Sequence, residues 1–167
     1  ASDQFKKNDV ELNLLQEYFL NIGMGKTSTS GHEGYGLNYL MKNKDLIIMN
    51  KKNQISHAKK IALQMYDNGY TKPIQRNDIK VLGQQALGAF YVGADSMLVG
   101  GYISDHDKKI AKKISNILAG GNLSQSTLVS EQYLLDLERE AFLSLCGERK
   151  TLERIQFMLK NGKPLRN

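Results

Sequence analysis

The stretch that decides the fold is LVSEQYLLDLEREAFLSLCGERKTLERIQFMLKNGKPLRN, residues 128–167. In its first half, apolar side chains recur at spacings of three, four and seven residues, which predicts a helix over residues 130–146 with one apolar face. That face consists of Leu134, Leu135, Leu137, Ala141, Phe142 and Leu145. Ser130 can cap the first turn through its hydroxyl, and Gly147 can adopt the left-handed conformation in which many helices end.

A second helix is predicted shortly after Gly147. Thr151 is its expected cap, and Gly162 followed by Pro164 ends it. The stripe that we expect it to bury consists of Leu152, Ile155, Met158 and Leu159. The two helices form a terminal pair over about residues 130–162, and a short basic tail follows.

The length and composition are those of one ordinary domain. The chain has 167 residues, of which 41% are hydrophobic, and this is enough for a core. No run of uncharged apolar residues is long enough to span a membrane, and the first residues lack the apolar segment of a signal peptide. We therefore expect a cytoplasmic location. Cys146 is the only cysteine, so an intramolecular disulfide is excluded, and we interpret it as a packing residue.

The net charge of +6 favours polyanionic partners. Nucleic acid and a phosphate-bearing cofactor both satisfy this condition. The lysines are scattered over several segments, and no zinc-finger, RRM or KH motif is present, so the sequence offers no specific sign of nucleic-acid binding. Charge alone does not choose between the two kinds of partner.

Residues 1–70 predict two longer helices, a short helix and a strand. The longer helices cover residues 10–22 and 52–68, where apolar side chains follow the helical period. Ser30 and Glu33 have the spacing of a capping box, which predicts a helix of one or two turns. Residues 45–50 form a short apolar run that predicts a lone strand or an extended segment.

Two further helices are predicted over residues 82–101 and 104–118, after a connector over residues 73–81. Ser104 and Asp107 repeat the capping spacing at the start of the second. We expect the glycines of the first helix to permit close helix packing, namely Gly83, Gly88, Gly93, Gly100 and Gly101. Four lysines of the second helix are interpreted as a solvated face, with an acidic partner as the alternative: Lys108, Lys109, Lys112 and Lys113.

The residue patterns of common active sites and metal centres are missing from the sequence. His32, His57 and His106 stand on separate segments without metal-ligand spacing, so we expect no metal site. No nucleophile elbow occurs, although a serine, histidine and acid triad stays open. Acidic side chains near Arg139 are interpreted as its ion-pair partners rather than as catalytic groups: Asp136, Glu138 and Glu140. We predict no catalytic residue in this chain.

Three short runs in the terminal helix pair carry a resemblance to a known family. They are Leu-Glu-Arg-Glu-Ala-Phe at residues 137–142, Gly-Glu-Arg-Lys at 147–150 and Asn-Gly-Lys-Pro at 161–164. They resemble the carboxyl terminus of the crotonase superfamily of enoyl-CoA hydratases and isomerases. The resemblance is closest to the version fused to bacterial 3-hydroxyacyl-CoA dehydrogenases of fatty-acid β-oxidation, which the insertion-like segment over about residues 80–121 also resembles.

The resemblance implies that residues 1–167 form a single, mostly α-helical fragment at the carboxyl end of a crotonase-like module. It has about six helices and at most a short strand. The implied parent polypeptide oxidises 3-hydroxyacyl-CoA with NAD and carries an enoyl-CoA hydratase/isomerase module. Because the catalytic parts of such enzymes lie outside the stretch that this chain resembles, we expect the chain itself to hold no cofactor and to be inactive. Its expected role is that of a lid and assembly surface for the acyl-CoA site.

The same resemblance implies contacts with coenzyme A from Phe142, Met158 and Lys163. Met158 stands where the family usually has a second aromatic residue, and Lys163 lies where a lysine approaches the adenine and phosphates. Expected partners are the rest of the parent polypeptide, acyl-CoA and further copies of the chain, because the faces of helices 10–22 and 52–66 would lack their usual cover. The alternative is a free-standing basic helical module that binds a protein or nucleic acid.

Overall fold

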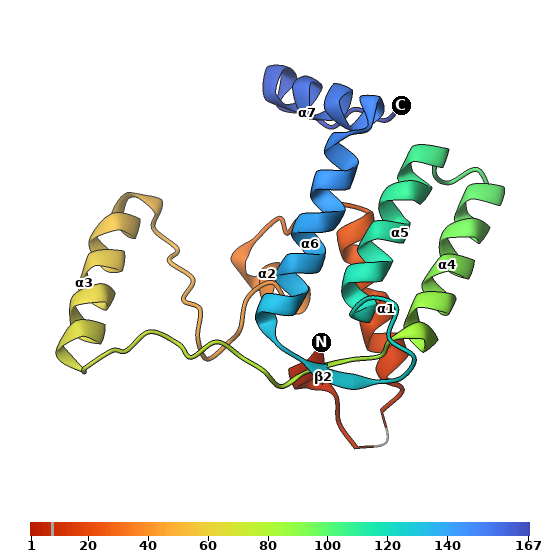
Figure 1. Cartoon of the computed structure of the whole chain (residues 1–167). Helices are drawn as coiled ribbons and strands as arrows, with labels where there is room; N and C mark the ends of the chain where they lie inside the picture. The colour runs from red at the N-terminus through yellow and green to blue at the C-terminus, as the bar shows by residue number, and fades with distance from the viewer. Residues whose placement is uncertain (8) are drawn as a thin grey trace. The chain divides into compact units, whose positions relative to one another are not determined.

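The computed structural model describes residues 1–7 and 9–167, and these are mostly helical (Figure 1). The described α-helices are α1 Glu11–Gly23, α2 Gly31–Gly36, α3 Gln54–Asp67, α4 Gln84–Val99, α5 Asp105–Ala119, α6 Glu131–Cys146 and α7 Arg149–Asn161. Two short strands, β1 Ile79–Val81 and β2 Thr127–Val129, and two 3₁₀-helices, Ser2–Gln4 and Lys51–Asn53, complete them. The predicted mostly α fold is confirmed. No helix in the described ranges combines the length and apolar character needed to cross a membrane.

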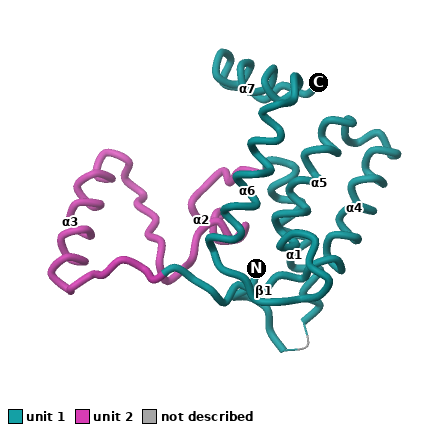
Figure 2. The backbone as a smooth tube through the Cα atoms, in the orientation of Figure 1, with its two compact units in different colours: residues 1–25, 75–167 teal, residues 26–74 magenta. Residues whose placement is uncertain are grey.

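The chain divides into two compact units (Figure 2). Unit 1 consists of Ala1–Gly25 and Gln75–Asn167, and it contains α1, both strands and α4 to α7. Unit 2 consists of Lys26–Ile74 and contains α2 and α3.

The core of unit 1 lies between α1, α4 and α5. Phe19 of α1 stacks on Phe90 of α4, with ring centroids 4.8 Å apart and planes inclined by 14°. The other buried members of this core are Leu15, Leu82, Ala86, Leu87 and Ala119. Most of them come from the insertion-like segment over residues 80–121. The expectation that the face of the helix over residues 10–22 lacks cover is therefore wrong, because α4 and α5 provide it.

A small antiparallel sheet closes one end of unit 1. β1 pairs with β2 in the register Ile79↔Val129, Lys80↔Leu128 and Val81↔Thr127. The sequence predicted only a connector over residues 73–81. The strand was missed because its partner is distant in sequence, and three residues carry no usable alternation.

Among the predicted packing glycines, Gly101 has a φ of +72° and requires glycine for its backbone conformation. Gly83, between β1 and α4, requires it as well. Its φ is +61°, and a Cβ there would collide with the carbonyl oxygen of Leu123. That oxygen accepts a hydrogen bond from the Gln84 amide at 2.8 Å, which draws the two backbones together. Close packing was the wrong reason for Gly88 and Gly93 of α4, since an added Cβ at either would meet nothing within 4 Å.

In unit 2, the hydroxyl of Ser30 accepts the Glu33 amide at 3.1 Å and starts α2 as predicted. The reciprocal half of the capping box is replaced, because the Glu33 carboxylate accepts from the amide and hydroxyl of Thr29, each at 2.6 Å. Residues 45–50 do not form the predicted strand. Ile47 instead lies against Gly31, and the main-chain oxygen of Asp45 accepts the Tyr35 hydroxyl at 2.7 Å. α3 buries none of its side chains.

The terminal helix pair forms nearly as predicted. Gly147 follows α6, but its φ is −75° and not the left-handed value that was predicted. The Ser130 hydroxyl caps α6 by accepting the Tyr133 amide at 3.1 Å, and Gly162 ends α7 with a φ of 64°. Thr151 is not the cap of α7, because the helix begins two residues earlier at Arg149. The stripe expected to be buried on α7 is also wrong, since Leu152, Met158 and Leu159 are all exposed.

Candidate functional site

The residues predicted to contact coenzyme A lie on the terminal helices of unit 1 and are open to solvent. Phe142 of α6 is 58% exposed and Met158 of α7 is 44% exposed. Lys163 follows the end of α7, is exposed, and makes no hydrogen bond or ion pair with any other residue that the structure describes. No described contact joins the three side chains to one another, so they are separate points on one surface.

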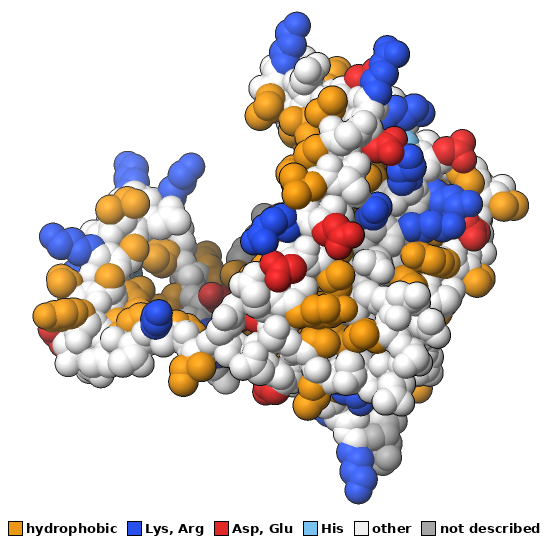
Figure 3. Space-filling view, viewed as in Figure 1, with side chains coloured by type: hydrophobic (Ala, Val, Ile, Leu, Met, Phe, Trp, Pro, Cys, Tyr) orange, Lys and Arg blue, Asp and Glu red, His pale blue; other side chains and the backbone are white. Residues whose placement is uncertain are grey.

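Apolar side chains gather over α7 and the adjoining end of α6 on the face viewed in Figure 3, with charged side chains beside them. α6 buries only Ala141, and α7 buries no side chain. The exposed apolar side chains are Leu135, Phe142 and Leu143 of α6 and Leu152, Ile155, Phe157, Met158 and Leu159 of α7. We call this set the α6–α7 apolar surface. Surfaces of this kind mark contacts with a partner or a ligand.

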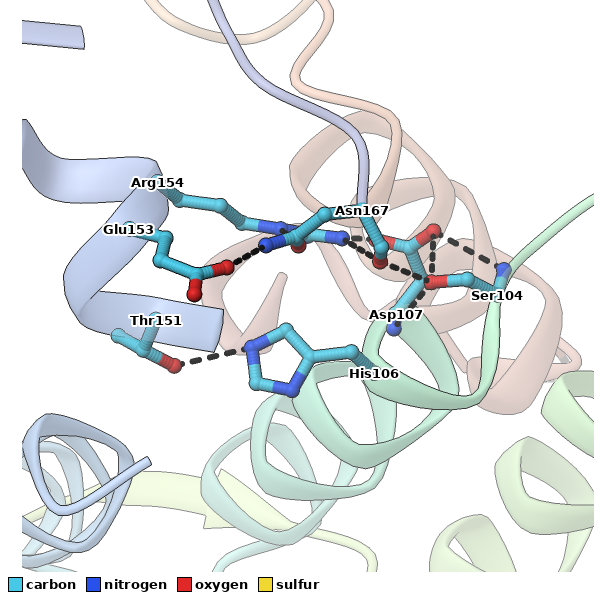
Figure 4. A network of polar contacts seen from close by, with 7 residues as sticks. All are labelled: Ser104, His106, Asp107, Thr151, Glu153, Arg154 and Asn167. Carbon is cyan, nitrogen blue, oxygen red and sulfur yellow. Dashed lines mark hydrogen bonds and ion pairs between the residues drawn. The ribbon is translucent and has the colours of Figure 1, made fainter. Parts of the chain in front are cut away.

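A polar network holds α7 against the start of α5 (Figure 4). Arg154 of α7 donates to Asp107 of α5, with 2.6 Å between Nη1 and Oδ1, and both side chains are mostly covered. Lys109 of α5 donates to Glu148, the residue before α7, at 2.8 Å. The terminal helix is therefore positioned by charge pairs at its first two turns.

The last residue of the tail joins the same network. The Asn167 side-chain oxygen accepts from Arg154 Nε at 2.8 Å, and its amide nitrogen donates to Glu153 at 2.9 Å. The main-chain oxygen of Asn167 accepts from Arg154 Nη2 at 3.2 Å. Residues 163–167 thus run from the end of α7 back to its middle, and this return places Lys163 at a bend beside the helix end.

Asp107 is the centre of the network. Its Oδ2 accepts from the amide and the hydroxyl of Ser104, at 3.0 Å and 2.9 Å, while the Ser104 hydroxyl accepts the Asp107 amide, so the predicted capping box is confirmed. Burial raises the pKa of Asp107, but the hydrogen bonds from Ser104 and Arg154 outweigh it and hold the pKa below its ordinary value. Asp107 is therefore a carboxylate at neutral pH.

His106 is the most covered charged or titratable side chain of this junction, with 5% of its surface exposed. Its Nε2 lies 3.0 Å from the hydroxyl of Thr151 on α7. Burial, followed by the charges of Arg154 and Lys150, lowers the pKa of His106. The imidazole is therefore neutral at pH 7.

The serine, histidine and acid triad that the sequence left open is not assembled at this junction. Its three candidate side chains would be Ser104, His106 and Asp107, but His106 contacts Thr151 rather than either neighbour. Asp107 is already engaged by Ser104 and Arg154. These contacts connect α5 to α7, and they do not pair a nucleophile with a general base.

The remaining candidates have structural partners. Arg139 pairs with Asp136 at 2.9 Å on the surface of α6. Among the α5 lysines, Lys108 and Lys112 pair with Asp95 of α4, and Lys109 pairs with Glu148, so much of the predicted solvated face is neutralised within unit 1. No group of three or more histidine, cysteine or acidic side chains suited to a metal is found in the described part of the chain.

Known proteins include a relative of this chain. The chain is 44% identical over 156 residues, or 93% of its length, to a protein of Bacillus subtilis (strain 168) named "Probable 3-hydroxyacyl-CoA dehydrogenase". This chain is homologous to one segment of that dehydrogenase. It spans about a fifth of the relative's length, since the match covers 20% of it. No family model matches the chain, and no solved structure matches it.

The homology supports the predicted relation to 3-hydroxyacyl-CoA dehydrogenases, and the crotonase-like origin of the segment stays a prediction. Sequence reasoning missed the junction of His106 with Thr151 and of Arg154 with Asn167. Only the Ser104 and Asp107 spacing pointed to it. The other contacts join residues 13 to 47 positions apart, and no local pattern reports such pairs.

Proposed function

We propose that this chain is the carboxyl-terminal helical part of a crotonase-like module in an NAD-dependent 3-hydroxyacyl-CoA dehydrogenase of fatty-acid β-oxidation. The observation that carries the proposal is the 44% identity to the dehydrogenase of Bacillus subtilis over 93% of the chain. An enoyl-CoA hydratase/isomerase module fused to the dehydrogenase follows from the resemblance of the terminal helix pair.

In the proposed parent, this chain serves as a lid and assembly surface for the acyl-CoA site. The α6–α7 apolar surface and α3, which buries none of its side chains, are areas that a larger polypeptide would cover. The described residues suit such a role, because Phe142 and Met158 offer apolar contact and Lys163 offers an unpaired cation to a phosphate. Acyl-CoA would carry the thioester that the parent acts on, and Lys163 would act as a point charge near its adenine and phosphates.

The described residues do not suit NAD. A dinucleotide fold needs parallel strands with a glycine-rich turn before a helix, whereas the described strands form one short antiparallel pair. We assign the oxidation step, the hydratase catalytic groups and the cofactor to other parts of the parent polypeptide.

The test compares the chain with the full-length parent. Purified residues 1–167 should neither reduce NAD in the presence of a 3-hydroxyacyl-CoA nor hydrate an enoyl-CoA, while the full-length polypeptide should reduce NAD. Turnover by residues 1–167 that survives repurification would contradict the proposed division of labour. A full-length polypeptide that binds nucleic acid or a protein partner but leaves NAD oxidised would favour the alternative, a basic helical interaction module.

A further inference from the structure

α7 depends on its junction with α5 for a fixed position. The helix has 13 residues and buries none of its side chains, so little apolar burial holds it. An isolated helix of this length is marginal in water. Its described links to α5 are polar: Arg154 with Asp107, Glu148 with Lys109, and Thr151 with His106. Whatever weakens this junction should therefore release and unfold α7.

His106 lies inside the junction among mostly positive groups. From α7 and its cap, it is influenced by Arg154, Lys150 and Glu148, and from its own helix by Lys109. Three of these four groups are cations. The neighbouring anion, Asp107, is engaged by Arg154 and Ser104. A positive charge on His106 would thus be buried, and the groups around it would repel it.

We propose that the α5–α7 junction is an acid-sensitive latch, in which protonation of the buried His106 releases α7 and the Asn167 tail from α5. Release would also detach Lys163 and the α7 part of the α6–α7 apolar surface from a fixed position, since both depend on α7. The latch requires only residues of unit 1.

The direction of the pH effect follows from the His106 environment. Burial holds the pKa of His106 below the value near 6.5 that it would regain once α7 leaves. The released state therefore binds the proton more tightly. Docking of α7 is strongest above about pH 6.5 and weakens as the pH falls below that value, by up to tenfold per pH unit until the docked imidazole titrates as well.

Amide hydrogen exchange on residues 1–167 tests the latch. Peptides covering α7 are compared with peptides covering α4, whose core position makes them an internal reference, after correction for the intrinsic pH dependence of exchange. The ratio of α7 to α4 protection should fall by up to about tenfold between pH 7.5 and pH 5.5. In His106→Gln, which keeps a polar side chain near Thr151 but does not titrate, the ratio should stay constant.

His57→Gln is the matched control, because His57 is exposed on α3 in unit 2, and this variant should show the wild-type fall. If His106→Gln loses α4 protection and is therefore unfolded, Lys150→Gln replaces it. Removing that exposed cation should make the fall smaller. A wild-type ratio that does not change with pH, an undiminished fall in a folded His106→Gln, or an undiminished fall in Lys150→Gln would overturn the latch.

Discussion

Arg154 Nη1 lies 2.6 Å from Asp107 Oδ1, and these two side chains retain only 18% and 26% of their exposure. They belong to helices separated by the whole of α6, and they join the terminal helix to the core helix α5. Because both charges are mostly removed from water, losing one leaves the other without its partner. A single substitution in this pair should therefore weaken the attachment of α7 to α5.

Asp107→Asn should lower the free energy of unfolding of residues 1–167 by about 2 kcal/mol, because it removes the Arg154 ion pair and half of the capping box. Urea unfolding at pH 7 measures the change. Asp136→Asn is the control, since Asp136 pairs with Arg139 on the exposed face of α6, and it should cost less than about 0.5 kcal/mol. Equal losses in the two variants would show that the junction is no more than a surface contact.

Because of the Asp107 carboxylate, we expect the free energy of unfolding to decrease at acid pH. The pKa of Asp107 is lower in the folded chain than in the unfolded chain, so its contribution is present above about pH 4 and is lost as the pH falls through the folded value. The urea midpoint of the wild type should therefore fall more steeply between about pH 5 and pH 3 than that of Asp107→Asn. Parallel curves would remove Asp107 as a source of this acid dependence.

Glycines 83 and 93 should respond to alanine in opposite directions. Gly83→Ala should lower the free energy of unfolding by more than about 1 kcal/mol, because φ is positive and the added carbon meets Leu123. Gly93→Ala should raise it by up to about 1 kcal/mol, because the site is inside α4 and has open space. Thermal unfolding of both variants distinguishes them. A stabilised Gly83→Ala would contradict the described turn.

Residues 1–167 should self-associate at concentrations on the order of tens of micromolar, because apolar areas of several hundred Å² seldom stay exposed. Leu159→Lys on α7 and Ile55→Lys on α3 should each weaken association, since these side chains are 82% and 81% exposed. The control is Lys72→Ala, because Lys72 is an exposed polar residue, and this variant should associate like the wild type. Sedimentation that shows a clean monomer would indicate a self-sufficient domain.

Local patterns predicted the parts of the fold that depend on neighbouring residues. The Ser104 and Asp107 capping box, the Ser130 cap and the end of α7 at Gly162 all follow from spacings of a few residues, and all were predicted. The left-handed conformation was predicted for Gly147, but it occurs at Gly162 instead. The β1–β2 pair was missed because it joins distant segments. Of the two alternatives predicted for residues 45–50, the strand does not form, because no described strand pairs with this apolar run.

The apolar periodicity correctly predicted the helix α7. The inference that its apolar stripe is buried was wrong. Periodicity shows that Leu152, Met158 and Leu159 share a face, but it does not show which polypeptide covers that face. The sequence pattern likewise does not show what the candidate site residues contact. Phe142 and Lys163 were placed by resemblance alone, whereas the Arg154 and Asn167 contacts that set the path of the tail have no local sequence signal.

The measurement that tests the lid most directly is the affinity of the full-length parent for coenzyme A. Lys163→Ala should weaken binding by about fivefold at low salt and much less at high salt, because an exposed point charge contributes about 1 kcal/mol and is screened. Lys72→Ala, an exposed lysine of unit 2, should leave the affinity unchanged at either salt concentration. An unchanged low-salt affinity in Lys163→Ala would contradict the account, because it would separate the terminal helices from the acyl-CoA site.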